Sequence, residues 1–202
     1  MVITKILIKN NVSTGKSPEQ VFETVNKILC ENNDTGMFVT AFMGYYNTAN
    51  GSFVYVNAGH NPPLVKKSGG NFDFLKTKPC LVLGSMENIV YREELVTLEP
   101  GDTLYMHTDG VTEAINAERD LFSEQRLLDA LNKNKEEAPK ELLSAVKREI
   151  DNFARGTEQA DDMTMLALEV KQYGPEDRYG LLEDCDRLDY DKNVLTLTKK
   201  IK

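Results

Sequence analysis

His-Thr-Asp-Gly-Val-Thr-Glu-Ala at residues 107–114 and Gln-Ala-Asp-Asp-Met-Thr at residues 159–164 decide the fold that we expect of this chain. Each stretch places carboxylates at the end of an apolar run that we expect to form a buried strand. Gly110, directly after Asp109, lets the backbone turn sharply. Carboxylates gathered from distant parts of a chain are typical of a site for Mg²⁺ or Mn²⁺, which prefer oxygen ligands. The two stretches therefore predict a shared divalent-metal site suited to phosphoryl-transfer or hydrolytic chemistry.

Both stretches also have a simpler interpretation. Asp109 could cap the N-terminus of a helix over residues 111–115, which is a common role for aspartate. Asp161 and Asp162 could lie in a solvated turn, because adjacent like charges are costly unless a cation is near. The residues by themselves leave these alternatives open, although the two stretches together are more specific than either one.

The composition narrows the class of protein. A chain of 202 residues fits one domain, and its net charge of -8 argues against a nucleic-acid binder and against docking on an anionic membrane. No apolar run approaches the roughly 20 residues needed to span a bilayer, and the N-terminus does not resemble a signal peptide. Three cysteines far apart in sequence give neither a zinc spacing nor a disulfide framework. We therefore expect a reduced, soluble, cytoplasmic protein.

Hydrophobic periodicity predicts an α+β chain. A buried helix is expected over residues 1–11, and a second helix starts at Ser17, with Pro18 at its first position and Gln20 placed for a capping box. Further helices are expected over residues 123–132 and 139–153. The expected strands cover residues 37–46, 52–58, a short run at 65, 72–75, 81–83, 89–98, 103–108 and 163–170.

The stretch Ala-Gly-His-Asn-Pro-Pro at residues 58–63 is the third unusual element. The pKa of histidine lies near neutrality, so His60 could act as a general acid. A histidine among glycine and proline more often stabilises a loop through hydrogen bonds. We expect His60 and its neighbour Asn61 to have this loop-stabilising role or to face a substrate, and we expect His107 to be a structural histidine within its strand.

Taken in order, these motifs resemble a known family. Thr-Ala-Phe at residues 40–42, the stretch from Asn57 to Pro63, Gly-Asp at 101–102, the 107–114 stretch and Asp-Asp-Met-Thr at 161–164 resemble the SpoIIE-like branch of the metal-dependent type 2C (PPM) serine/threonine phosphatases. The resemblance covers residues 1–171. It implies an antiparallel β-sandwich flanked by helices, with two Mn²⁺ or Mg²⁺ ions at one end. It also implies that metal-bound water attacks a phosphoserine or phosphothreonine of a regulatory protein, typically an anti-sigma-factor antagonist.

The resemblance assigns roles to particular residues. Asp109 matches the metal ligand of the family's Asp-Gly motif, Gly110 follows it, and Asp161 matches the ligand of the final acidic motif, with Asp162 beside it. The family normally opens with two strands that carry a Gly-Gly-Asp and a Gly-Asp motif. This chain resembles the family only from the helix after them, as if it were truncated at the N-terminus. No acid within residues 1–36 is placed to substitute, so we expect part of a metal site, without activity in isolation.

The leading hypothesis is a phosphatase domain over residues 1–171 that acts on a phosphorylated regulatory protein. The alternative is a non-catalytic pseudophosphatase, an interaction module in bacterial signalling. Residues 172–202 read as an acidic linker with an extra strand over 193–201. We expect that strand either to extend a sheet of its own chain or to pair with a second copy, which would give a homodimer.

Overall fold

The structure is a computed structural model that describes residues 2–31, 33–34, 36–157, 161–171 and 194–195. It divides into two compact units. The first comprises Met1–His60, Thr77–Thr97 and, from the later described residues, Val194–Leu195, and the second comprises Asn61–Lys76 and Leu98–Gln172. Helices and antiparallel sheets occur in both units, which agrees with the predicted α+β class. No helix among the described residues is long and apolar enough to cross a membrane.

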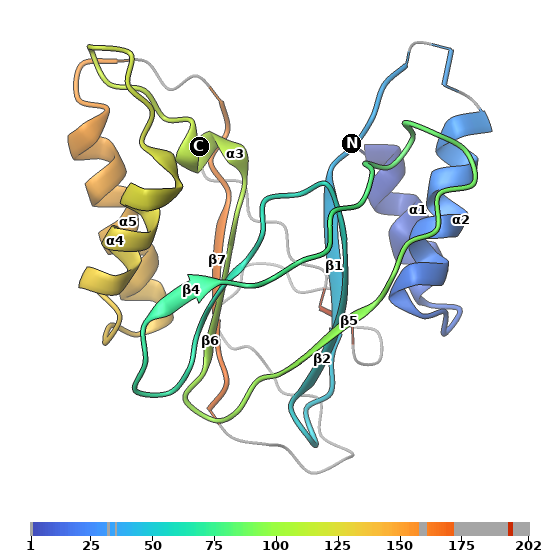
Figure 1. Cartoon of the computed structure of the whole chain (residues 1–202), viewed down its shortest axis with the longest axis horizontal. Helices are drawn as coiled ribbons and strands as arrows, with labels where there is room; N and C mark the ends of the chain where they lie inside the picture. Colours follow the sequence, from blue (N-terminus) through green and yellow to red (C-terminus); the bar gives the residue numbers. More distant parts are fainter. Residues whose placement is uncertain (1, 32, 35, 158–160, 172–193, 196–202) are drawn as a thin grey trace. The chain divides into compact units, whose positions relative to one another are not determined.

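The first unit is built on a four-stranded sheet in the order β5-β2-β1-β8. Its central hairpin joins β1 and β2, its helices are α1 and α2, and Figure 1 shows both helices beside this sheet. Helix α2 contacts β1 and β2, and α1 packs on α2. The bounds are α1 Val2–Val12, α2 Pro18–Glu31, β1 Ala41–Tyr46, β2 Ser52–Ala58, β5 Glu94–Thr97 and β8 Val194–Leu195.

The predicted start of α2 is confirmed. The side chain of Gln20 accepts a hydrogen bond from the backbone N–H of Ser17 at 3.2 Å, and Ser17 Oγ accepts one from the N–H of Gln20 at 3.5 Å. This reciprocal pair is the capping box, and it satisfies two N–H groups that the first turn leaves without intrahelical partners.

Helix α1 forms as predicted, but the expectation that it is buried is wrong. Ile3 is 68% exposed and Ile6 is 52% exposed, whereas Thr4 is buried. Apolar residues occur all around this helix, and only the side that carries Leu7, Ile8 and Val12 packs against the core of the first unit. A helix that contacts a single partner can bury only one face.

Several predicted strands are shorter than expected, and one does not form. Strand β1 begins at Ala41. Asn33, which follows α2, accepts a hydrogen bond from the N–H of Met37 and donates one to its C=O, each at 2.7 Å, and so holds that residue away from the sheet. Residues 81–83 contribute only an isolated bridge between Leu83 and Val39. Strand β5 covers only Glu94–Thr97 of the predicted 89–98 run.

The extra strand predicted over residues 193–201 is described only at β8. Val194 and Leu195 pair with Tyr45 and Gly44 of β1, so this short segment extends the sheet of its own chain. The rest of the predicted strand, and the linker expected from residue 172, lie outside the described residues.

The second unit is built on an antiparallel sheet in the order β4-β3-β6-β7, and Figure 1 shows α4 and α5 beside it. Helix α5 contacts β7, and α4 contacts β4 and α5. The apolar positions predicted for α4 and α5 form the core with the sheet; Leu127, Leu131, Leu142, Val146 and Ile150 are at most 1% exposed. The bounds are β3 Leu64–Lys66, β4 Phe72–Phe74, β6 Thr103–His107, α3 Asp109–Thr112, α4 Ser123–Lys133, α5 Pro139–Phe153 and β7 Met165–Glu169.

Candidate metal centre

The pairing of β6 with β7 brings the two acidic stretches together. The strands are antiparallel, with His107 opposite Met165, and the backbone N–H of Thr108 donates to the C=O of Thr164 at 3.0 Å. Asp109 therefore follows β6 at the same end of the sheet at which Asp161 precedes β7. This confirms the predicted proximity of the two stretches.

Thr108 joins the two stretches through its side chain as well. Its hydroxyl oxygen accepts a hydrogen bond from the backbone N–H of Thr164 at 3.0 Å and donates one to the C=O of Asp162 at 3.2 Å. One hydroxyl thus satisfies two backbone groups of the opposite stretch. It fixes the register of the backbone beside all three aspartates.

Gly110 is required by this close approach rather than by a sharp turn. A Cβ atom at Gly110 would lie 2.7 Å from the carbonyl oxygen of Asp162 and 3.3 Å from that of Asp161. Its φ lies outside the positive region in which glycine is favoured, so the turn itself does not need glycine. The absence of a side chain at residue 110 lets the backbone of the second stretch pack against the first.

The helix-capping alternative for Asp109 is wrong. Asp109 opens the single-turn helix α3, and the residue at the cap position is Thr108, whose side chain forms no capping hydrogen bond. Asp109 Oδ1 instead accepts from the adjacent N–H of Gly110 at 2.9 Å, and Asp161 Oδ1 accepts from the N–H of Asp162 at 2.6 Å. Asp109, Asp161 and Asp162 are all exposed at the edge of the sheet.

Exposed carboxylates at one edge of the sheet supply the oxygen ligands that a hard divalent cation prefers. Each carboxylate offers two oxygens, and Mg²⁺ or Mn²⁺ in such a site keeps several waters. The ligand count is low, however. Over the ranges that the structure describes, no group of three or more histidine, cysteine, aspartate or glutamate side chains is arranged to hold a metal ion. Asp109 and Asp161, with Asp162 adjacent, could therefore furnish only part of a two-ion site.

The Gly-Asp pair at residues 101–102 is structural. Asp102 is 1% exposed, and its carboxylate accepts from Lys67 Nζ at 2.7 Å and from the backbone N–H groups of Ser68 and Glu99 at 2.8 and 2.9 Å. Its own backbone C=O accepts from the N–H of Val170 at 2.9 Å. These contacts anchor the start of β6, at the end of the strand opposite Asp109.

His60 lies in the first unit, in a turn that a neighbouring amide holds. Asn57 is buried; its Oδ1 accepts from the N–H of His60 at 2.8 Å and its Nδ2 donates to the C=O of His60 at 2.9 Å. His60 Nδ1 lies 3.4 Å from Thr40 Oγ1. These contacts are those of a stabilised loop. Asn61 is partly exposed in the loop that opens the second unit.

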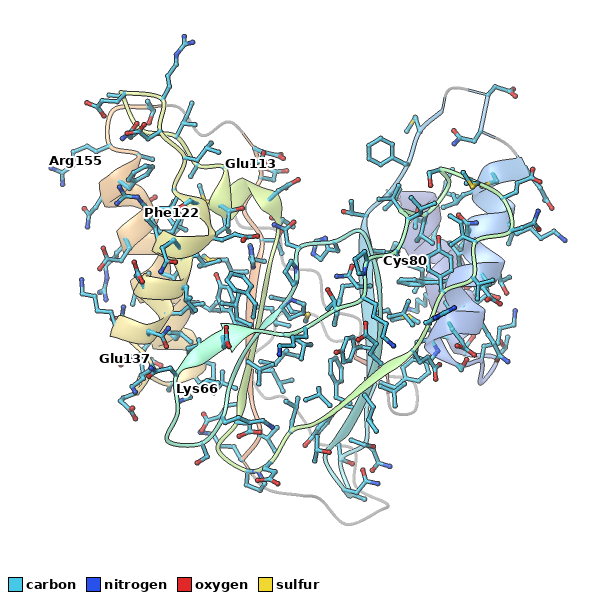
Figure 2. The ribbon with its side chains drawn as sticks, viewed as in Figure 1. Lys66, Cys80, Glu113, Phe122, Glu137 and Arg155 are labelled. Carbon is cyan, nitrogen blue, oxygen red and sulfur yellow. The ribbon has the colours of Figure 1, made fainter. Side chains whose placement is uncertain are left out.

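A pocket of about 290 Å³ lies beside Asp161 in the second unit. Glu113, Asp151 and Arg155 line it, and none of the three is among the site residues predicted from the sequence. Figure 2 shows Glu113 at α3 and Arg155 near the end of α5. The signal for Glu113 was present, because it belongs to the first acidic stretch, four residues after Asp109. Arg155 and Asp151 carry no local signal, since only the packing of α5 brings them to this pocket.

Comparisons with known proteins agree with the geometry. The family described as Stage II sporulation protein E (SpoIIE) matches residues 1–171. The protein IcfG of Synechocystis sp. (strain ATCC 27184 / PCC 6803 / Kazusa) is 36% identical over 145 residues, which cover 72% of this chain and 23% of the relative. The phosphoserine phosphatase RsbU of Bacillus subtilis (strain 168) is 33% identical over 113 residues, or 56% of this chain and 34% of the relative. The matched region thus spans about a quarter to a third of the length of these relatives.

Solved structures share the fold. The SiaA-PP2C domain of Pseudomonas aeruginosa matches with a TM-score of 0.72 and 17% identity, covering 83% of this chain and 68% of that domain. RsbX in complex with magnesium matches with a TM-score of 0.56 and 18% identity, covering 82% of this chain and 70% of RsbX. The predicted type 2C phosphatase fold is confirmed by these likenesses, and magnesium is bound by one of the proteins that share it.

Proposed function

Because this chain belongs to the SpoIIE family of type 2C phosphatases, we propose that its second unit carries part of a metal-dependent centre for hydrolysing phosphoserine or phosphothreonine. The observation that supports the proposal is the meeting of the two acidic stretches, in which the backbone of Asp162 packs directly on Gly110. Asp109 and Asp161 are the proposed metal ligands, and Asp162 is a neighbour that assists them.

A bound pair of Mn²⁺ or Mg²⁺ ions would supply Lewis-acid stabilisation of the attacking and leaving oxygens. The protein's contribution is to hold the ligand carboxylates in position. Asp109 and Asp161 hold charge at one edge of the sheet, and Thr108 fixes the two backbones that carry them. The ligand set in the described residues is smaller than two dications require, so we expect little or no turnover from this chain in isolation.

The proposed substrate is a phosphorylated regulatory protein of the anti-sigma-factor antagonist type, and the proposed setting is bacterial signalling. The relative RsbU, named a phosphoserine phosphatase, supports the reaction type. We place the phosphatase domain at residues 1–171 and a linker at 172–202, most of which lies outside the described residues. His60 and Asn61 are proposed as loop-stabilising residues, and a homodimer stays a prediction.

A non-catalytic interaction module is the second candidate. The observation that favours it is the low ligand count, since the described part of the chain contains no cluster of three metal-binding side chains. Such a module would keep the exposed acidic edge and bind a signalling partner without turnover.

Manganese binding separates the two candidates. Titration calorimetry with MnCl₂ should show one weak site, and Asp109→Asn and Asp161→Asn should each weaken it by about tenfold or more because each removes an anionic ligand. Asp129→Asn is the matched control, because Asp129 is exposed on α4, where it accepts a hydrogen bond from Gln125. Release of phosphate from a phosphoserine peptide with Mn²⁺ is measured on the same proteins.

The outcomes are distinct. Site-specific loss of Mn²⁺ affinity, together with Mn²⁺-dependent release of phosphate that falls in the same two variants, supports the phosphatase. Equal affinity in Asp109→Asn, Asp161→Asn and Asp129→Asn would remove the metal centre. Specific binding without any release of phosphate would favour the non-catalytic module.

A further inference from the structure

The pocket beside Asp161 has walls of a particular chemistry. Part of its lining is apolar, from Ala114, Ile115, Ala154 and Met163, and a carboxylate is contributed by Glu113. Its volume of about 290 Å³ is at the small end of the range for ligand pockets, which suits one long side chain. Lysine and arginine pack an aliphatic stem on apolar surface while the charged head reaches a polar partner. The pocket has the features that such a side chain needs.

Glu113 is well placed to be that partner. It follows α3, and its backbone N–H donates to the C=O of Asp109 at 2.8 Å, so it lies directly beside the proposed metal ligands. Its side chain is exposed and forms neither a hydrogen bond nor an ion pair with any residue of the described ranges. Its negative charge is therefore available to a ligand that enters the pocket.

The other charged residues of the lining are already engaged or lie away from Glu113. Asp151 forms an ion pair with Lys147 one helical turn earlier, and Asp161 is assigned to the metal. Arg155 would repel a basic ligand, but it is exposed and Figure 2 shows it near the end of α5 rather than beside Glu113 at α3. The net charge of -8 over the whole chain also favours a basic partner over an acidic one.

We propose that Glu113 recognises a lysine or arginine close in sequence to the phosphorylated residue of the substrate, and that this pocket receives the basic side chain. The inference rests on the proposed function for the position of the phosphate, which the metal-ligand aspartates define. It adds a substrate feature to that function, namely a basic residue within reach of the phosphoserine or phosphothreonine.

Labelled phosphopeptides test the proposal. In an alanine background, one lysine is moved through the positions from three before to three after a phosphoserine, and binding to the chain with Mn²⁺ is measured by fluorescence anisotropy at low salt. One position should bind about two- to fivefold more tightly than the all-alanine peptide, as expected for an exposed ion pair. Glu113→Gln should abolish this preference, and Glu118→Gln, an exposed glutamate outside the pocket lining, should retain it.

Two results with the lysine peptides would overturn the proposal: no lysine position binds more tightly, or the preference survives in Glu113→Gln. A third result would come from peptides that carry glutamate in place of the lysine, if they bind more tightly than the all-alanine peptide and lose this advantage in Arg155→Ala. The last result would assign the pocket to acidic side chains. Since the readout is binding, a lysine preference that is lost in Glu113→Gln supports this role of Glu113 whether or not the chain in isolation releases phosphate. Phosphate release without a lysine preference supports the phosphatase and excludes this role of Glu113.

Discussion

Two residues that are not themselves proposed as metal ligands fix the geometry of the candidate metal centre. Thr108 bonds to two backbone groups across the junction, and Gly110 leaves room for the carbonyl oxygen of Asp162. Neither residue carries charge. The three aspartates can be gathered at one edge only because these two positions let the backbones meet.

Removing the hydroxyl of Thr108 should loosen that junction. Thr108→Val keeps the shape of the side chain but leaves the N–H of Thr164 without its side-chain acceptor, which should lower the free energy of unfolding by about 1–3 kcal/mol. Thr108→Ser keeps the hydroxyl and should cost much less. Denaturation in urea measures both, and equal losses in the two variants would show that the hydroxyl contributes little.

At the scale of elements, β6 is held at both ends. Asp102 anchors its start through Lys67, Ser68 and Glu99, and Thr108 joins its end to the stretch before β7. Helix α5 contacts β7 and buries its apolar face in the same core. A strand fixed in this way presents Asp109 from a rigid support.

The helix layer should therefore account for much of the stability of the second unit. Leu142 of α5 is 1% exposed, and Leu142→Ala should lower the free energy of unfolding by about 2–5 kcal/mol by leaving a cavity. Leu121→Ala removes the same atoms from a residue that is 52% exposed and should change it by no more than about 0.5 kcal/mol. Thermal unfolding compares the two, and similar losses would contradict the assigned core.

Helices whose first residues mark their own start could be predicted from the sequence. Features that depend on contacts with residues elsewhere in the chain could not. Ser17 and Pro139 mark helix starts by their own chemistry, and both predictions are confirmed. Residues 37–40 read as a strand because their side chains favour one, but Asn33 holds Met37 away from the sheet. The exposure of Ile3 likewise depends on which face of α1 meets α2, and periodicity alone does not determine that.

At the scale of the whole molecule, burial of tyrosines makes stability depend on alkaline pH. Burial, and then the nearby charge of Glu94, raises the pKa of Tyr55 from 10.0 to about 12, and burial also raises the pKa of Tyr105. The folded state therefore keeps a proton that the unfolded state releases above pH 10. Stability is fully present below pH 10 and is lost as the pH rises toward the folded pKa.

Tyr55→Phe should make the free energy of unfolding fall less steeply as the pH rises. Between pH 10 and pH 12 the wild-type free energy of unfolding should fall by up to about 1.4 kcal/mol per pH unit for each such tyrosine. The variant should lack the share due to Tyr55, whatever its stability at neutral pH. Urea denaturation across this range measures the slope, and an unchanged slope would place the ionisation of Tyr55 near its ordinary pKa of 10.0.

Some residues of the candidate site could be predicted from the sequence, and others could not. The order of the motifs made Asp109 and Asp161 the predicted metal ligands, and antiparallel pairing of their strands places both at the same end of the sheet. The pocket was not predictable, because Arg155 and Ala154 reach it only when α5 packs in the second unit. Glu113 belongs to the first acidic stretch, but its proposed role depends on pocket walls formed by residues within 151–163, which lie 38 to 50 positions later in the chain.

The hydrogen bond between Thr108 and Asp162 closes a loop whose ends are 54 positions apart in the chain. The entropy of closing a loop grows only with the logarithm of its length, so doubling the segment would cost about 0.6 kcal/mol. Insertions between α4 and α5 should therefore be inexpensive, as long as the register of β6 and β7 is preserved. An evolving chain is free to remodel its helical connection while the acidic edge stays as it is.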